Sequence, residues 1–294
     1  TMVGQSFLLP MHWCKQARQP DDLPKGPQAP TRVLVMVTCI DLLALSLINT
    51  TYNILPGSII QMLRGCKVMF TCFLSKLILG KTQQWYQLLG VGMNFIGLLL
   101  TGLAGDRSEW DGGALSHPQA VVAAFAVGIT SQLVGSFQFI YEAKTMKQYD
   151  VPALQLGGME GIIGAPIGLL VLLTVNVMGR EDTPSAIAQM GQSSSKAGLM
   201  LGFLVAVATF NLSGITVTKY GSPVLRAMLE IARTALIWAV EVTLGWNQFS
   251  TNQLGGYVIT SIGTLIYSHV IVIPFLEPAK PDNGKLSAGL IPKA

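Results

Sequence analysis

Residues 88–103 read LLGVGMNFIGLLLTGL, a stretch without a single charged side chain. With its flanks it predicts a helix over 85–104, long enough for the ~30 Å hydrocarbon core of a bilayer. The whole chain has the same character, because 50% of its 294 residues are hydrophobic and only 12% are charged. Soluble domains carry roughly 25% charged residues. The composition therefore excludes a water-soluble enzyme and predicts an integral membrane protein.

Further apolar stretches predict seven more helices of the same kind. They lie near residues 32–53, 57–80, 118–142, 151–178, 197–218, 223–245 and 253–275. Thr1–Cys14 is also apolar, but at 1.5 Å per residue it reaches only about 21 Å and is too short to cross a bilayer. We therefore expect eight complete helices and one partial helix, whose beginning is absent from this sequence.

Lysine and arginine are unevenly divided between the two ends of these helices. If the helices alternate in direction, one side carries eleven basic residues and the other carries three, Arg107, Arg180 and Lys196. The eleven are Lys15, Arg18, Lys25, Arg32, Lys81, Lys144, Lys147, Lys219, Lys280, Lys285 and Lys293. Because basic loops stay on the cytoplasmic side of a membrane, this side and the C-terminal tail are predicted to face the cytosol or an organelle matrix.

Two parts of the chain resemble each other at a shift of 166 residues. Gln87-Leu88-Leu89-Gly90 with Gly97 recurs as Gln253-Leu254-Gly255-Gly256 with Gly263, and Met62-Leu63 recurs as Met228-Leu229. Five helices separate the equivalent positions, and an odd number of crossings reverses the direction of the chain. The sequence therefore favours two inverted repeats, an arrangement that many secondary transporters share.

Nine charged side chains fall inside the predicted helices, where each costs about 2.5–3.5 kcal/mol if it is left unpaired. They are Asp41, Arg64, Lys67, Lys76, Glu160, Arg226, Glu230, Arg233 and Glu241. In the helix 223–245, spacings of 4, 3 and 8 residues place Arg226, Glu230, Arg233 and Glu241 on one face. Two interpretations stay open: this stripe lines a polar translocation pathway, or it forms structural ion pairs that hold helices together.

The polar residues within the helices give a predicted substrate pathway. Its members are Arg64, Lys67, Gln132, Gln138, Glu160, Asn211, Glu230 and Arg233. Gln132 and Gln138 belong to a polar edge of the helix 118–142, which also carries Glu142. Lys76, Arg226 and Glu241 are predicted to form structural charge pairs.

Catalysis, metal binding and cofactor binding are not predicted. The three histidines, His12, His117 and His269, are far apart, and the four cysteines have no CxxC spacing. No nucleophile motif and no phosphate-binding glycine loop occur, so the sequence does not indicate an enzyme. The basic residues are scattered, and nucleic acid is not predicted as a partner.

A set of short motifs extends through nearly the whole chain. They are Gln61-Met62-Leu63-Arg64-Gly65, Gly158-Met159-Glu160-Gly161, Phe210-Asn211, Gly214-Ile215-Thr216-Val217-Thr218-Lys219, and Arg233-Thr234 followed by Trp238 and Leu244-Gly245-Trp246. In these motifs the sequence resembles the drug/metabolite transporter (EamA-type) superfamily, and in particular the nucleotide-sugar-transporter-like F subgroup of solute carrier family 35, which is related to the chloroquine-resistance transporter. The resemblance implies ten helices in two inverted five-helix repeats, a central cavity, and alternating access without ATP.

We therefore expect an all-α integral membrane protein, a polytopic bundle of two inverted five-helix repeats. Residues 1–104 are the remainder of the first repeat, 105–117 a linker, 118–275 the second repeat and 276–294 a cytosolic or matrix tail. The predicted function is secondary transport of a small organic metabolite, such as a nucleotide-sugar or another anionic or zwitterionic solute, by alternating access.

One alternative to transport stays open. The chain is then a non-transporting, transporter-derived structural subunit of an organellar complex, for example in the mitochondrial inner membrane, and the missing first helix favours this interpretation. The predicted partners are the lipid bilayer and a small-molecule solute, with a homodimer or a larger organellar membrane complex as further alternatives. The predicted location is an organelle membrane, either endomembrane, lysosome-like or mitochondrial inner membrane.

Overall fold

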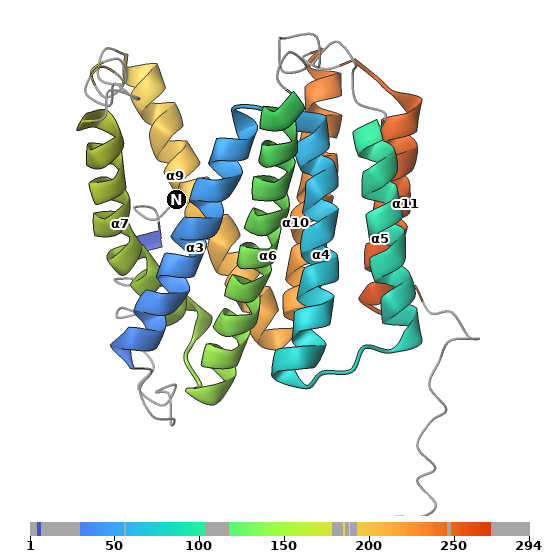
Figure 1. Cartoon of the computed structure of the whole chain (residues 1–294), viewed down its shortest axis with the longest axis horizontal. Coiled ribbons are helices and arrows are strands. Elements are labelled where there is room, and N and C mark those ends of the chain that lie inside the picture. Colours follow the sequence, from blue (N-terminus) through green and yellow to red (C-terminus); the bar gives the residue numbers. More distant parts are fainter. Residues whose placement is uncertain are drawn as a thin grey trace, which may run out of the picture.

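The protein is a bundle of long helices in the computed structural model, which describes residues 5–6, 30–55, 57–103, 118–177, 185, 188, 193–245 and 248–271. The helices are α3 (Thr31–Tyr52), α4 (Gly57–Leu79), α5 (Trp85–Leu103), α6 (Pro118–Gln148), α7 (Ala153–Val177), α9 (Ser194–Tyr220), α10 (Pro223–Thr243) and α11 (Thr251–Tyr267) (Figure 1). The residues in these ranges include no β-strand, and consecutive helices run in opposite directions. The predicted all-α fold is confirmed.

Five of these helices, α3, α5, α6, α7 and α9, are long and apolar enough to cross a membrane. Helices α4 and α10 carry charged side chains through their middle, and α11 has 17 residues. All of them stand side by side in one bundle (Figure 1). The chain is therefore an all-α membrane protein. The segment 105–117, the tail 276–294 and all of Thr1–Cys14 except Gln5 and Ser6 lie outside the described residues.

Two helices end at other positions than the sequence predicts. Helix α6 continues to Gln148 instead of 142, because its apolar face extends through the buried Met146. It stops before Asp150, whose φ of 48° is left-handed. The predicted end of the last helix at 275 is wrong: α11 ends at Tyr267, and His269 adopts a φ of 62°, which helical residues do not have.

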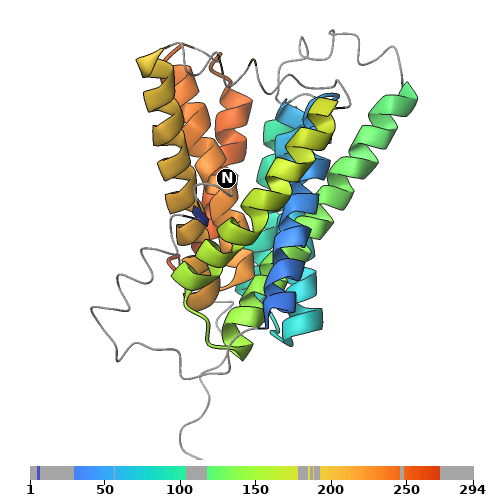
Figure 2. The same ribbon diagram turned by 90° about the vertical axis from the view of Figure 1, so that its left-hand side faces the viewer.

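The bundle is tightly packed at one end and spread at the other. We call the end at which α3 begins and α6 ends the lower end, as it is drawn in Figure 1. There an apolar cluster consists of Leu34, Met146, Val151, Ala153, Leu156 and Ile215. Towards the upper end α7 and α9 separate, as Figure 2 shows. Their side chains, such as Leu173 and Leu199, are 53% and 73% exposed there.

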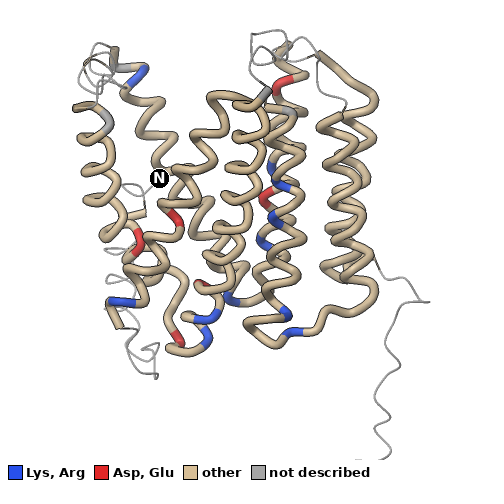
Figure 3. The backbone as a smooth tube through the Cα atoms, in the orientation of Figure 1, with Lys and Arg blue, Asp and Glu red and all other residues tan. Residues whose placement is uncertain are grey.

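Basic side chains gather at the lower end and in the middle of the bundle (Figure 3). Described residues at or next to lower helix ends are Arg32, Lys81, Lys144, Lys147 and Lys219, whereas Lys196 lies at the upper end, in the first turn of α9. The described part of the chain therefore has the same bias of positive charge that the sequence predicts.

Helices α5 and α11 pack along each other through Gly90 and Gly97 on α5 and Gly256 and Gly263 on α11. Gly256 and Gly263 are the equivalents of Gly90 and Gly97 at the shift of 166 residues. A Cβ atom on Gly90 would lie 2.6 Å from the carbonyl oxygen of Gly263, and one on Gly97 would lie 2.6 Å from that of Gly256. Between these contacts Asn94 Nδ2 donates to the carbonyl oxygen of Thr260 at 3.2 Å. Gly90 therefore contacts Gly263, the repeat equivalent of Gly97, and Gly97 contacts Gly256, the repeat equivalent of Gly90.

Candidate functional site

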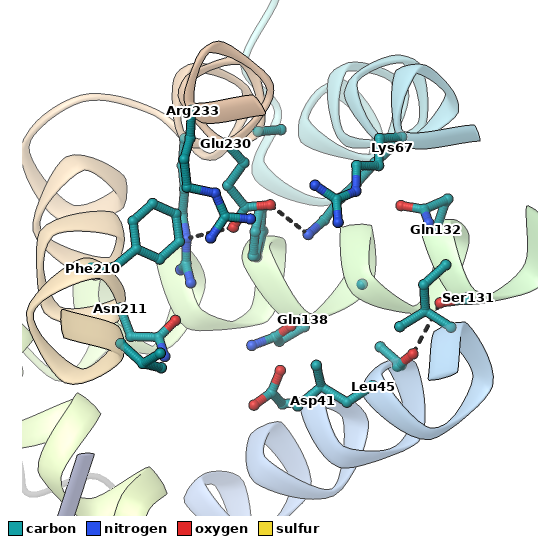
Figure 4. A pocket seen from close by; sticks show the side chains of 18 of the residues that line it. Asp41, Leu45, Lys67, Ser131, Gln132, Gln138, Phe210, Asn211, Glu230 and Arg233 are labelled. Atoms are coloured by element: carbon teal, nitrogen blue, oxygen red, sulfur yellow. Dashed lines mark hydrogen bonds and ion pairs between the residues drawn. The ribbon is translucent and has the colours of Figure 1, made fainter. Parts of the chain in front are cut away.

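A cavity of about 520 Å³ lies in the middle of the bundle, between α3, α4, α6, α7, α9 and α10 (Figure 4). Its wall includes every residue of the predicted pathway: Arg64, Lys67, Gln132, Gln138, Glu160, Asn211, Glu230 and Arg233. Exposure varies along the wall: Phe203 is 58% exposed and Glu160 is 2% exposed. The six helices thus bring together residues that are up to 192 positions apart in the sequence, from Asp41 to Arg233.

Helix α6 contributes one polar face to this cavity. Ser131, Gln132, Gly135, Gln138 and Phe139 recur every three or four residues and line the wall together. A Cβ atom on Gly135 would come within 3.3 Å of Lys67 Cε, so the glycine leaves space for the lysine side chain of α4. The absence of a side chain at this position is therefore what lets Lys67 extend into the cavity.

Lys67 bridges α4 and α10, because its Nζ donates to Glu230 Oε2 at 3.0 Å. The same Nζ lies 3.8 Å from the centre of the Phe139 ring, and Arg226 Cζ lies 4.0 Å from that centre. Phe139 therefore contacts two cations with its π faces, an arrangement that stabilises positive charge in a desolvated site.

Arg226 and Glu142 form a buried ion pair between α10 and α6, below Phe139. Glu142 also accepts a hydrogen bond from Gln138 Nε2 at 2.8 Å, and Arg226 Nε lies 3.9 Å from Glu230 Oε1. Arg226 fits against α9 because Gly214 has no side chain; a Cβ atom there would lie 2.9 Å from Arg226 Nε. These contacts join three helices at the lower side of the cavity.

Arg64 and Arg233 are the two cavity cations without a carboxylate partner among the described residues. Arg64 donates to the Tyr52 hydroxyl at 2.9 Å and to Thr234 Oγ1 at 3.4 Å. Arg233 Cζ lies 4.3 Å from the Phe210 ring centre, and its Nε has no hydrogen-bond partner. The two guanidinium groups are close enough to interact electrostatically. An ion pair of Arg233 with Glu230 or Glu160 is not formed, because Lys67 binds Glu230.

The other charges of the predicted set lie apart from the cavity wall. Lys76 is in the last turn of α4 and is exposed, and Glu241 is near the upper end of α10. The sequence assigned Arg226 to structural pairing. In the structure Arg226 pairs with Glu142 and Glu230, and it also lines the cavity.

The cavity residues that were not assigned to the pathway from the sequence include Asp41, Phe139 and Phe210. Asp41 is visible in the sequence as a lone charge inside an apolar helix, and its carboxylate points into the cavity (Figure 4). Phe139 has a weaker signal, its position seven residues after Gln132 on the polar face of α6. No group of three or more His, Cys, Asp or Glu residues within the described ranges could hold a metal ion.

The sequence was compared with known proteins. No family model matches it. It is 32% identical over 289 residues to solute carrier family 35 member F6 of Homo sapiens, which covers 94% of this chain and 75% of the relative. The member F6 protein of Pongo abelii is 31% identical over 292 residues, with coverage of 95% and 76%. An uncharacterized protein of Schizosaccharomyces pombe is 26% identical, with coverage of 83% and 76%.

A solved crystal structure has the same fold. It superposes with a TM-score of 0.60 at 14% identity and covers 92% of this chain and 88% of its own. At that identity the likeness concerns the helix arrangement alone. The relationship to the human protein is closer and extends over most of both chains. The chain therefore belongs to solute carrier family 35, in the F subgroup of these transporter-like membrane proteins.

Proposed function

We propose that the protein is a secondary transporter that moves a small anionic or zwitterionic organic solute by alternating access. The observation that supports this function is the Arg64–Arg233 pair, two guanidinium groups in a cavity wall without a carboxylate partner in the described residues. Guanidinium binds carboxylate and phosphate through paired hydrogen bonds. Glu230 acts electrostatically on both arginines but is ion-paired with Lys67, so an anionic solute between them would supply the directly bound negative charge that they lack.

The arrangement of the helices suits alternating access around this cavity. Residues 1–104 and 118–275 are then the two inverted repeats, joined by 105–117, and α4 and α10 are equivalent helices in them. Lys67 and Glu230 connect these helices. In the repeat, Arg233 is the equivalent of Lys67, and Arg64 is the equivalent of Glu230. Five of the cavity charges, Arg64, Lys67, Arg226, Glu230 and Arg233, therefore lie on the two elements that must separate and close in turn.

The proposed orientation places the lower end in the cytosol or an organelle matrix, because basic residues gather there. We expect a cysteine replacing Lys147 to react with a membrane-impermeant thiol reagent on that side only. A cysteine replacing Lys196 is expected to react from the opposite side only. The test uses sealed vesicles of the organelle membrane, with the four native cysteines replaced by alanine. Labelling of both positions from the same side would contradict the alternation of helices between them.

Transport and binding are tested by a cysteine replacing Asn211, which lines the cavity on α9. In the same cysteine-free background we expect this thiol to react with a small aqueous reagent. Sulfate, citrate or a nucleoside monophosphate at ten times its dissociation constant should slow the reaction roughly tenfold, because the anion occupies the cavity. The matched control is Ala208→Cys on the same helix, where the side chain is 8% exposed and the thiol should stay unreactive.

The arginine pair is tested in the same assay. Arg233→Gln should leave the Asn211→Cys reaction rate unchanged without anion and abolish the protection by anions. An inert thiol at position 211 would favour a static structural subunit over a carrier. A reactive thiol that none of the anions protects would keep the water-filled cavity and contradict the anionic class of solute.

A further inference from the structure

Two buried oxygen atoms beside the cavity have no hydrogen-bond donor among the described residues. Glu160 is 2% exposed and its Oε1 has no partner; Gln5 is 4% exposed and its Oε1 has none either. The two residues lie on adjoining segments, because a Cβ atom on Gly161 would lie 2.8 Å from Ser6 Cα. Both residues line the cavity. Leaving a buried acceptor without a donor costs about 1–3 kcal/mol, so native proteins rarely do it. We infer that a hydrogen atom that these oxygens could accept is missing from their surroundings.

Helices α3 and α9 pack against α7, and charges on α3, α6 and α10 act on Glu160. Asp41 on α3, Glu142 on α6 and Arg226 on α10 all interact with it electrostatically. Helix α9 contributes Lys219, whose Nζ is occupied by the carbonyl oxygen of Val151 at 3.1 Å and by Asp150 at 3.6 Å. Three carboxyl groups thus share one guanidinium group.

That guanidinium group is already engaged. Arg226 pairs with Glu142, which is fully buried, and its Nε is 3.9 Å from Glu230. Three ionised carboxylates with one shared cation repel one another strongly in a medium of low dielectric constant. A single proton on one carboxyl group weakens that repulsion, and on Glu160 it supplies the missing donor at the same time.

A metal cation fits this place poorly. Hard cations such as Na⁺ need several oxygen ligands, but both oxygens of Glu142 are taken by Gln138 and Arg226. The Arg226 guanidinium would also repel a second cation. Among the described residues, no three acidic, His or Cys side chains converge as metal ligands. A proton needs one oxygen only.

We propose that Glu160 is the proton-binding residue of a proton-coupled carrier, in which the Glu160 carboxylate takes up one proton before the solute is bound. The coupling to a solute rests on the proposed function. Four acidic residues, Asp41, Glu142, Glu160 and Glu230, stand with four basic residues, Arg64, Lys67, Arg226 and Arg233, in and beside the cavity. With a proton on Glu160 the site carries one net positive charge, which a singly charged anion cancels. Proton and anion therefore favour each other's binding by the same factor.

The proton itself is detected by infrared spectroscopy on the full chain in lipid. We expect the carbonyl stretching band of a protonated carboxyl group at neutral pH, shifted in D₂O, and its loss in Glu160→Gln. The matched control Glu241→Gln, near the upper end of α10, should retain the band. Thermal melting of each variant establishes that it is folded. A band that persists in Glu160→Gln, or that disappears when Na⁺ replaces choline, would overturn the proposal.

Coupling is measured in vesicles that contain a pH-sensitive dye. Addition of external sulfate, whose charge is constant over this pH range, should acidify the interior with the parent protein and not with Glu160→Gln. Sulfate that protects the Asn211 thiol without acidification would overturn coupling at Glu160. If sulfate, citrate and the nucleoside monophosphate all give no protection, the anionic class fails, while the infrared band still decides whether Glu160 binds the proton.

Discussion

Arg226→Ala is expected to lower the free energy of unfolding by about 3–5 kcal/mol, because it leaves Glu142 buried without its cation. The Glu142 side chain is 0% exposed, and Gln138 is then its remaining hydrogen-bond donor in the described structure. An uncompensated carboxylate at this depth cannot reach water without separating α6 from α10. We expect a large loss of monodisperse protein in detergent and a lower melting temperature.

The control for this prediction is Arg233→Ala. Arg233 is on the same helix, two turns away, and has no carboxylate partner among the described residues, so its removal strands no buried charge. We expect a melting temperature close to that of the parent, together with the loss of anion protection. Equal melting of Arg226→Ala and Arg233→Ala would contradict the assignment of Arg226 to a structural ion pair.

A double variant separates loss of charge balance from loss of packing. Arg226→Met with Glu142→Leu removes both partners and fills a similar volume, and such replacements are often neutral or stabilising. We expect it to regain most of the folded yield that Arg226→Ala loses. If the double variant were as unstable as the single one, the guanidinium group itself, through Phe139 and Thr218, would be what the fold requires.

The sequence predicts the helices well because apolar length is a local property. Each of the eight complete helices that the sequence predicts is present, whereas the partial helix predicted within Thr1–Cys14 lies outside the described residues except for Gln5 and Ser6. The main error in length, at the end of α11, has a local cause that hydropathy does not register. Residues 268–275 are apolar enough to continue a helix, but Ser268 ends it and His269 has left-handed backbone angles. Hydropathy reports burial in the bilayer, whereas backbone angles decide where a helix stops.

The members of the cavity could also be predicted, but their pairing could not. Helical spacing places Arg226, Glu230 and Arg233 on one face, and this face lines the cavity as expected. Which cation binds Glu230 depends on the opposite helix, and Gly135 gives Lys67 the space to reach it. Spacing along one helix contains no information on that contact, so it could not show that Lys67, and not Arg233, binds Glu230.

Gly97→Leu is expected to prevent folding of the α5–α11 pair, the second large effect. A Cβ atom alone at this position would lie 2.6 Å from the Gly256 carbonyl oxygen and 2.8 Å from the Thr260 nitrogen. Both atoms belong to the backbone of α11, so no change of rotamer can relieve the contact. Overpacking typically costs about 1–3 kcal/mol, and a leucine against backbone should exceed that range.

Gly92→Leu is the matched control on the same helix, because a Cβ atom at Gly92 would meet nothing within 4 Å. Its helix propensity improves by the same amount, so any difference between the two variants measures the helix contact alone. Gly256→Leu and Gly255→Leu form the corresponding pair on α11. We expect the folded yield to drop for Gly97→Leu and Gly256→Leu and to stay near the parent's for the two controls.

The two damaging variants should also resemble each other in size of effect. Gly97 and Gly256 belong to one contact, in which each would direct its new side chain at the other's carbonyl oxygen at the same distance of 2.6 Å. Under the shift of 166 residues this contact corresponds to that between Gly263 and Gly90, where a Cβ atom on either glycine would lie 2.6–2.7 Å from the other's carbonyl oxygen. Normal folding of either leucine variant, measured by size-exclusion chromatography and melting, would show that the helices can separate here. The close α5–α11 contact would then not be required for folding. The paired glycine contacts would no longer support the inverted repeat.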